Sequence, residues 1–490
     1  MGANVKSSKG GRSTETSNSI PSELRQFVQR NTYSLLIKGS AGTGKTTLSL
    51  TILRALRVKS NFFYISTRIS PKQLFVYYPW LGKFVGRPKI SESDEMSGQG
   101  YNLSSFEDAR LDEPESLFER ITNQLMDVKA PIIIIDSWDA IASFMDKEAR
   151  LNNERVLQIW RERAGAKLIF INEDPNDTTL DFLVDGIVHL ERKYYGDVMV
   201  RQILLSKLRG IMINRSTYIY SLNNGIFRSY DAYRPYDFDI TTSQARLYEA
   251  ENPLLSISEE GYITSGHKVL DKILGGGYMR KKLVLIDIES NVNMSVIMAF
   301  LYPIMSNFVL SNNPILFHPF DGMDSNDVIS YLKIEDLNMH QNWLINISCH
   351  LRKTDGKSDQ NLVQTEDYDN PKEYFDYLQN VVIKTRQQYP NKFLLCIMGT
   401  RISHKITKYA ETSEMDIFRF IRANTDLTLI VSGNPQNTSH YVSEMCDVHM
   451  KFTTLKGSLF LQILMPKPSL YAVLPPASPS SPTIRLDPVV

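Results

Sequence analysis

The sequence predicts an α/β protein of two tandem domains, each a parallel β-sheet followed by antiparallel hairpins, with the second domain degenerate. Three observations lead to this prediction. In the first half, short apolar segments alternate with segments of helical periodicity, which is typical of a parallel, doubly wound sheet. Two hairpin patterns follow that parallel part. The second half repeats motifs of the first half at a constant spacing, which indicates one duplicated unit.

The composition is that of an ordinary globular protein. Its 490 residues allow about two domains, with 42% hydrophobic and 22% charged residues. The formal net charge of +1 gives no global attraction to nucleic acid. Cys349, Cys396 and Cys446 have no metal-ligand spacing and are expected to be reduced thiols. No apolar segment is long enough to span a bilayer, so we expect a soluble, cytoplasmic protein without a membrane partner.

A phosphate-binding loop is predicted at residues 39–46, where GSAGTGKT matches the pattern G-x-x-x-x-G-K-[ST]. The apolar residues 33–38 predict a strand before the loop, and residues 46–56 predict a helix after it. The glycines let successive backbone N–H groups turn toward one point, where the N-terminal end of the helix adds positive charge. The predicted nucleotide-binding residues are Gly39, Ser40, Ala41, Gly42, Thr43, Gly44, Lys45, Thr46 and Thr47. We expect ATP as the ligand, although such a loop contacts phosphates and does not specify adenine.

Two residues are predicted to hold Mg²⁺ beside these phosphates. Lys45 would supply charge to the β- and γ-phosphates, and the Thr46 hydroxyl would ligate the metal. Residues 131–136, PIIIID, predict a central strand that is buried on both faces and ends in an acid. Nucleotide sites of open α/β sheets lie at that edge, so Asp136 is the expected partner of the metal.

The other elements of the first domain follow the same patterns. Residues 61–66 and 167–172 predict further buried strands, and helical periodicity begins at Pro114 between them. Residues 186–208 and 217–227 each predict a pair of strands around a turn. A parallel core followed by antiparallel hairpins is the order found in RecA-type ATPases.

Several short motifs carry a resemblance to a known family. They are FYIS at 63–66, SPKQL at 70–74, LVDGIVHL at 183–190 and KLRG at 207–210. On these motifs the chain resembles the KaiC branch of the RecA superfamily. Within that branch, STR at 66–68 and YYPW at 77–80 are most similar to the archaeal gas-vesicle D protein family. The resemblance implies an ATP-binding regulator with a phosphate loop and basic segments.

One departure from the family bears on hydrolysis. The resemblance implies a Glu-Glu pair before the SP motif, where a glutamate orients the attacking water, but Arg68 and Ile69 stand here. Such help is worth about 10²–10⁴-fold in rate, so its loss predicts slow turnover. Asp139 or Glu173 could take the role, or either could be a surface or structural acid. The predicted catalytic residues are Lys45, Asp136 and Glu173.

Basic residues near the end of the first domain allow several interpretations. The resemblance implies that Lys207 and Arg209 contact nucleotide phosphates of a neighbouring subunit; otherwise they lie on a solvated strand. They belong to a wider cluster that suits a nucleic-acid surface, a subunit interface or a protected sheet edge. That cluster comprises Arg192, Lys193, Arg201, Lys207, Arg209 and Arg215, with Tyr194 and Tyr195.

The second half is a copy that has lost its phosphate loop. Residues 262–300 resemble the beginning of a KaiC domain, but the loop glycines and the lysine are replaced by Ile288, Asn291, Asn293 and Met294. Side chains there would obstruct the approach of the backbone to phosphate. The strand at 394–399 also lacks a terminal acid. We expect this domain not to bind nucleotide in the usual way.

Two matches fix the spacing of the copies, because Pro435 and Gln462 lie 260 residues after Pro175 and Gln202. At that offset Lys467 corresponds to Lys207 and could face the nucleotide of the first domain; a structural or partner-binding role for the second domain is the alternative. The predicted order is a disordered tail at 1–18, an ATP-binding domain at 19–228, a semi-ordered linker at 229–258, a degenerate domain at 259–474 and a disordered Pro/Ser-rich tail at 475–490.

These observations favour a regulatory protein in which ATP·Mg²⁺ acts as a conformational switch with slow or no hydrolysis. Its expected partner is another protein or a second copy of the chain. The alternative is a DNA-dependent RecA-type ATPase of recombination or repair, for which the near-zero net charge is unfavourable. A third interpretation is a scaffold that retains ATP only as a structural ligand.

Overall fold

The computed structural model describes most of the chain, and only the described residues are discussed below. They are residues 19–85, 104–110, 114–125, 128–145, 156–157, 159–162, 164–238, 261–318, 344–346, 371–400, 414–433, 440–476 and 483–489. The chain divides into two compact units, the first comprising residues 1–231 with 489–490 and the second residues 232–488. The predicted tail at 1–18 and most of the predicted linker lie outside the described residues.

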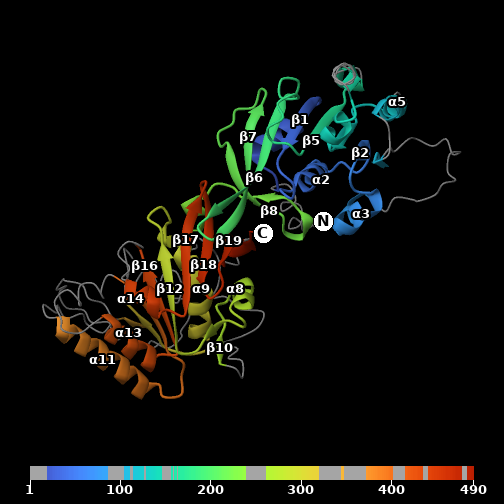
Figure 1. Ribbon diagram of the computed structural model, residues 1–490. Helices are drawn as coiled ribbons and strands as arrows, with labels where there is room; N and C mark the ends of the chain where they lie inside the picture. The colour runs from blue at the N-terminus through green and yellow to red at the C-terminus, as the bar shows by residue number, and fades with distance from the viewer. Residues whose placement is uncertain are drawn as a thin grey trace, which may run out of the picture. The chain divides into compact units, whose positions relative to one another are not determined.

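The first unit is built on a nine-stranded sheet in the order β3-β2-β4-β5-β1-β6-β7-β8-β9 (Figure 1). Its strands are β1 (Tyr33–Lys38), β2 (Phe62–Ser66), β3 (Ser104–Asp108), β4 (Ile132–Asp136), β5 (Lys167–Asn172), β6 (Gly186–Tyr195), β7 (Val198–Leu208), β8 (Thr217–Ser221) and β9 (Arg228–Ser229). Strands β3 to β6 of this order run parallel, and each pair from β6 to β9 is antiparallel. The predicted parallel core and both predicted hairpins are therefore present.

One helix precedes the first strand of this sheet, and the others connect its parallel strands. They are α1 (Ser22–Val28), α2 (Lys45–Ala55), α3 (Pro71–Tyr77), α4 (Pro79–Val85), α5 (Pro114–Leu125) and α6 (Trp138–Ala142). Alternate residues of each strand enter two separate cores, as β4 shows: Ile132 and Ile134 join the core that contains α2, and Ile133 and Ile135 join the core that contains Trp138. Burial on both faces explains the run of four isoleucines.

The second unit repeats this architecture. Its nine-stranded sheet has the order β14-β13-β15-β16-β12-β17-β18-β19-β20. Its strands are β12 (Lys282–Ile288), β13 (Ile315–Phe317), β14 (Leu344–Asn346), β15 (Leu395–Gly399), β16 (Leu427–Ser432), β17 (Val448–Leu455), β18 (Ser458–Met465), β19 (Ser469–Leu474) and β20 (Arg485–Pro488), beside a small hairpin of β10 (Tyr262–Ile263) and β11 (Tyr278–Met279). Strand β12 lies between β16 and β17 as β1 lies between β5 and β6. The prediction of two tandem α/β domains is confirmed.

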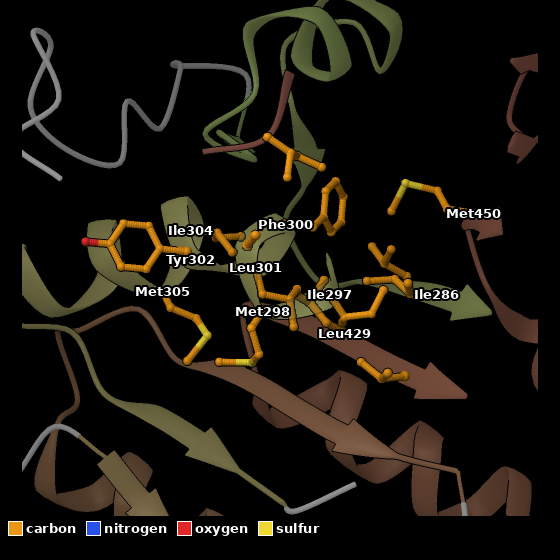
Figure 2. Close-up of a cluster of buried hydrophobic side chains, with 14 of the residues drawn as sticks. Ile286, Ile297, Met298, Phe300, Leu301, Tyr302, Ile304, Met305, Leu429 and Met450 are labelled. Carbon is orange, nitrogen blue, oxygen red and sulfur yellow. The ribbon is translucent and has the colours of Figure 1, made fainter. Parts of the chain in front are cut away.

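The helix after β12 is buried around its whole circumference. The helices of this unit are α8 (Lys268–Ile273), α9 (Met294–Leu310), α11 (Pro371–Gln388), α13 (Glu414–Asn424) and α14 (His440–Met445). Helix α9 carries no Asp, Glu, Lys or Arg among its 17 residues. Figure 2 shows Ile297, Phe300 and Leu301 of α9 in one cluster with Ile286 of β12 and Leu429 of β16. Such burial is typical of a helix enclosed within a large core.

The predicted disordered tail at 475–490 is wrong in its last part. Strand β20 pairs antiparallel with β19, from Tyr471 opposite Pro488 to Leu474 opposite Arg485. The reason is a short alternating pattern, in which Ile484 and Leu486 are buried in the core of the second unit. This packing outweighs the Pro/Ser-rich composition that precedes it.

Among the described residues, no helix combines the length and the apolar character needed to cross a bilayer.

Candidate functional site

The loop between β1 and α2 has a backbone that requires glycine. Gly42 and Gly44 have φ angles of 74° and 93°, a region that side chains disfavour. A Cβ atom on Gly39 would lie 2.5 Å from the carbonyl oxygen of Leu190, and one on Gly44 would lie 2.7 Å from Leu222. No side chain of the described residues caps the N-terminus of α2, so its first N–H groups face the loop. This is the cradle that a phosphate group needs.

Lys45, the first residue of α2, turns back over this loop. Its Nζ donates hydrogen bonds to the carbonyl oxygens of Gly39 at 2.7 Å and Ser40 at 3.1 Å, and the residue is 6% exposed. Burial lowers the pKa of the Lys45 ammonium, and nearby carboxylates, that of Glu173 first, act in the opposite direction. Lys45 therefore places a cation at the cradle, where β- and γ-phosphates are held in such loops.

Thr46 and Asp136 meet beside Lys45. The Thr46 hydroxyl donates a 2.6 Å hydrogen bond to Oδ2 of Asp136, and the Tyr64 hydroxyl donates to the same oxygen. Burial raises the pKa of Asp136, while the hydrogen bonds from Thr46 and Tyr64 oppose that shift. A hydroxyl and a carboxylate at one point are the oxygen ligands that Mg²⁺ takes beside phosphates. The residues present therefore fit a nucleotide with its magnesium ion.

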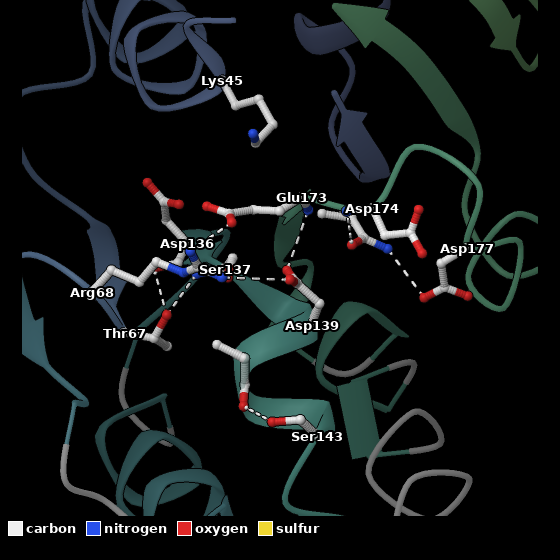
Figure 3. A network of polar contacts seen from close by, with 12 residues as sticks. Lys45, Thr67, Arg68, Asp136, Ser137, Asp139, Ser143, Glu173, Asp174 and Asp177 are labelled. Carbon is white, nitrogen blue, oxygen red and sulfur yellow. Dashed lines mark hydrogen bonds and ion pairs between the residues drawn. The ribbon is translucent and has the colours of Figure 1, made fainter. Parts of the chain in front are cut away.

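Three charged side chains lie along the same edge of the sheet (Figure 3). Arg68 follows β2, Asp139 lies in α6 after β4, and Glu173 follows β5. Nη1 of Arg68 is 2.6 Å from Oε2 of Glu173, and Nη2 of Arg68 is 3.8 Å from Oδ2 of Asp139. The backbone N–H of Glu173 also donates to Oδ1 of Asp139 at 3.3 Å. The structure thus brings both alternative acids together and pairs each with Arg68.

Several contacts of the loop were not predicted from the sequence. The Tyr220 hydroxyl donates to the Thr43 carbonyl at 2.5 Å, and the hydroxyls of Thr47 and Tyr78 are 2.9 Å apart. Nη2 of Arg192 donates to the Ala41 carbonyl at 2.6 Å. Tyr220 and Arg192 lie on β8 and β6, remote in sequence from the loop, and no local motif signals their contacts with it. The pattern at 77–80 was noted as a family feature, and its Tyr78 is the residue that reaches α2.

Lys207 and Arg209 contact the segment before β6 rather than the phosphate loop. Nζ of Lys207 donates to the carbonyl of Asp181 at 2.9 Å, and Arg209 is 3.1 Å from Asp185. Asp185 in turn accepts hydrogen bonds from Ser34, the second residue of β1. The loop begins after Lys38, four residues further along that strand or about 13 Å at ~3.3 Å per residue. Arg209 therefore lies near the start of β1, away from Arg192, which contacts the loop at Ala41.

In the second unit, the start of α9 corresponds to the start of α2, and residues of the second unit itself bind its polar groups. The Asn293 side chain accepts from the N–H of Ser295 at 2.9 Å and so caps α9. The N–H of Asn293 donates to the Tyr233 hydroxyl at 2.9 Å, and the Ser295 hydroxyl donates to the carbonyl of Pro235 at 3.3 Å. Tyr233 precedes the short 3-10 helix Pro235–Phe238, which begins at Pro235 and whose Phe238 joins the core of this unit. N–H groups at the start of α9 thus already have partners.

Lys467 does not occupy the place of Lys207 in the strand register. In the first hairpin, Lys207 pairs with Ile187, next to the irregularity of the strand register. In the second hairpin, the pair next to the equivalent irregularity is Met465 with His449, so Met465 corresponds to Lys207. Lys467 follows the end of β18 and is exposed. The strand β15 ends at Gly399, so the second unit also has no counterpart of Asp136 there.

A phosphate loop, a helix that starts at its lysine and a carboxylate at the end of a neighbouring parallel strand define the first unit as a P-loop ATPase domain of RecA-type architecture. Residues 24–206 match the family model described as "GvpD gas vesicle protein, P-loop domain". The resemblance seen in the sequence is therefore confirmed, and this part of the chain is similar to the GvpD P-loop domain.

Three curated proteins are similar to this chain. Protein GvpD2 of Halobacterium salinarum is 24% identical over 353 residues, which cover 68% of this chain and 67% of that protein. Protein GvpD1 of the same organism is 26% identical over 304 residues, which cover 59% of this chain and 54% of that protein. A UPF0273 protein of Saccharolobus solfataricus is 24% identical over 216 residues, covering 41% and 76%. The chain thus spans about half to three quarters of these relatives, and the similarity to GvpD2 extends beyond the P-loop domain.

Proposed function

We propose that this chain is a regulatory protein in which ATP·Mg²⁺, bound by the first unit, acts as a conformational switch with slow hydrolysis. One observation carries the proposal. The cradle, Lys45 and the pair of Thr46 with Asp136 are all in place, whereas the position expected for a water-orienting glutamate holds Arg68. A site equipped to bind and poorly equipped to hydrolyse suits a switch better than a motor.

The residues that hold the nucleotide follow from the geometry. The N–H groups of the loop and the start of α2 take the phosphates, and Lys45 neutralises the β- and γ-phosphates. Thr46 and Asp136 hold the magnesium ion, which when bound neutralises charge on the phosphate oxygens.

Slow hydrolysis follows from the chemistry of Arg68. A guanidinium has no acceptor and cannot take a proton from water. The carboxylates of Glu173 and Asp139 that could do so are paired with that guanidinium. Loss of such catalytic help lowers a rate by about 10²–10⁴-fold.

The second unit and the basic residues Lys207 and Arg209 supply contacts in this proposal. Lys207 and Arg209 contact Asp181 and Asp185 rather than their own phosphate loop, which supports contact with the nucleotide of another copy. The second unit binds no nucleotide and transmits the state of the first to a protein partner, with Lys467 as an exposed contact residue. Arg192, Lys207 and Arg209 each bind a different carbonyl or carboxylate group of the chain. This favours the regulatory proposal over a DNA-dependent ATPase.

Steady-state ATP turnover and binding of a fluorescent ATP analogue, each with Mg²⁺, test the proposal in wild type and Lys45→Ala. We expect tight binding, slow turnover that single-stranded DNA leaves unchanged, and loss of both in Lys45→Ala. The matched control is Lys59→Ala, which removes an exposed lysine beyond the far end of α2. Strong stimulation by DNA would contradict the regulatory proposal and support the DNA-dependent ATPase.

A further inference from the structure

We propose that Arg68 is a sensor that distinguishes nucleoside triphosphate from diphosphate, and that Glu173 competes with the nucleotide for it. This inference rests on the proposed function of the first unit. It assigns to Arg68 a specificity for the γ-phosphate, and to Glu173 the role of holding the guanidinium when no γ-phosphate is present.

The backbone that carries Arg68 is fixed while its side chain is exposed. The Ser66 hydroxyl donates to the carbonyl of Ile69 at 2.6 Å and accepts from its N–H at 3.3 Å, which closes a turn around Arg68. The N–H of Thr67 donates to the carbonyl of Asp136 at 2.8 Å and ties this turn to the end of β4. The Arg68 side chain is 51% exposed. It therefore starts from a fixed point beside the magnesium ligand and is free to change partner.

The charges along this edge show what the guanidinium would meet. Figure 3 shows Lys45 pointing toward the side of the site where Asp136 and Glu173 lie, and Arg68 lies across from it. A γ-phosphate drawn to Lys45 would bring negative charge next to these acids. Phosphate oxygens accept a guanidinium fork in two parallel hydrogen bonds, as a carboxylate does. Arg68 thus has two competing partners of the same chemical kind.

The present pairing is weak enough to be exchanged. Glu173 is 25% exposed and Arg68 is half exposed, and ion pairs so close to solvent contribute little stability. A diphosphate lacks the group that competes with Glu173, so with ADP the pairing of Arg68 with Glu173 stays as it is. Transfer of Arg68 to a γ-phosphate would leave the carboxylate of Glu173 without that partner.

The test measures dissociation constants of the full chain for Mg·ADP and a non-hydrolysable Mg·ATP analogue. Arg68→Met should weaken binding of the ATP analogue about tenfold and leave ADP unchanged, since one charge-assisted contact is lost. Glu173→Gln should instead tighten binding of the analogue several-fold, because the competing charge is gone. Arg68→Lys keeps a charge without the fork and should fall between wild type and Arg68→Met. The matched control is Lys72→Met, an exposed cation four residues further on.

The inference is supported if Arg68→Met weakens binding of the ATP analogue and Glu173→Gln tightens it. An unchanged ratio of ATP-analogue to ADP affinity in Arg68→Met and Arg68→Lys overturns it and leaves the proposed function standing. Equal weakening by Arg68→Met and Glu173→Gln also overturns it, because Glu173 would then support the site rather than compete. No nucleotide binding by the wild type would reject the proposed function itself, and this inference with it.

Discussion

The Thr46 hydroxyl and the Asp136 carboxylate are joined by a 2.6 Å hydrogen bond across 90 residues of sequence. The pair exists because β1 and β4 run parallel with β5 between them, so their carboxyl ends meet at one edge of the sheet. Tyr64 of β2 donates to the same carboxylate from the other side. The described site is thus already arranged around the two groups expected to hold a metal ion.

Removal of the Thr46 hydroxyl should abolish the metal dependence of nucleotide binding. In Thr46→Ala the carboxylate of Asp136 stays, but one of the two oxygen ligands is gone. We expect the gain in affinity on adding Mg²⁺ to fall about tenfold or more. Calorimetric titration of ADP with Mg²⁺ and with a chelator measures this. Ser49→Ala, which removes a hydroxyl one turn further along α2, should behave as wild type.

Alanine at Gly44 should both destabilise the first unit and prevent binding. The φ of 93° is unfavourable for a side chain, and the added Cβ would lie 2.7 Å from Leu222. We expect a loss of about 1–3 kcal/mol in the free energy of unfolding. The comparison is Gly196→Ala in the hairpin of β6 and β7, where φ is 57° and no described atom lies within 4 Å of the new Cβ. Urea unfolding should show the larger loss for Gly44→Ala; equal losses would mean that the contact with Leu222 is relieved without cost.

Asp136→Asn should stabilise the ligand-free protein at neutral pH while it removes metal binding. Burial raises the pKa of Asp136 in the folded state above its unfolded value, so ionisation costs folding free energy once the pH exceeds the unfolded pKa of about 3.9. That cost grows as the pH rises toward the folded pKa and then stays constant. The Tm difference between Asp136→Asn and wild type should therefore be positive at pH 7 and shrink as the pH falls toward 4. A difference independent of pH would show that the hydrogen bonds from Thr46 and Tyr64 cancel the effect of burial on the pKa of Asp136.

Nucleotide should bind with a stoichiometry of one per chain. The N–H of Asn293 already donates to Tyr233, and Asn293 caps the N–H of Ser295. Met294→Lys should therefore create no second site, although it restores a lysine at the position that corresponds to Lys45. Equilibrium dialysis with a radiolabelled nucleotide measures the number. A value of two for the wild type would show that the second unit binds nucleotide after all.

The features of the site that depend on short segments of the chain could be predicted from the sequence. The loop at 39–46 and the acid at Asp136 are defined by local spacing and by the run of isoleucines, and both lie where they were expected. The pairing of Arg68 with Glu173 could not be predicted from the sequence, because it depends on β2, β4 and β5 being neighbours in that order. Which of the two alternative acids lies nearer Arg68 is likewise a matter of tertiary packing.

Other features were missed because the signal was weak or displaced. Tyr233 contributes one hydroxyl to the start of α9, and no motif marks such a contact. The strand at Arg485–Pro488 is short, and the Pro/Ser-rich composition before it dominated the prediction. The constant offset misplaced Lys467 because the strands of the second hairpin are shorter. The last pair of the first hairpin is Tyr195 with Val198, eight residues after Ile187, whereas that of the second is Leu455 with Ser458, six residues after His449.

If ATP binds as proposed, the capped start of α9 gives the two halves of the chain a different dependence on the ATP concentration. A domain that binds ATP gains stability as the ATP concentration rises above its dissociation constant. The second unit has its own Asn293 and Tyr233 where a ligand would lie, so its stability does not follow that concentration. On the proposed function, a fall in ATP would loosen the first unit and leave the second unchanged, so a partner would meet a change in one half of the molecule alone.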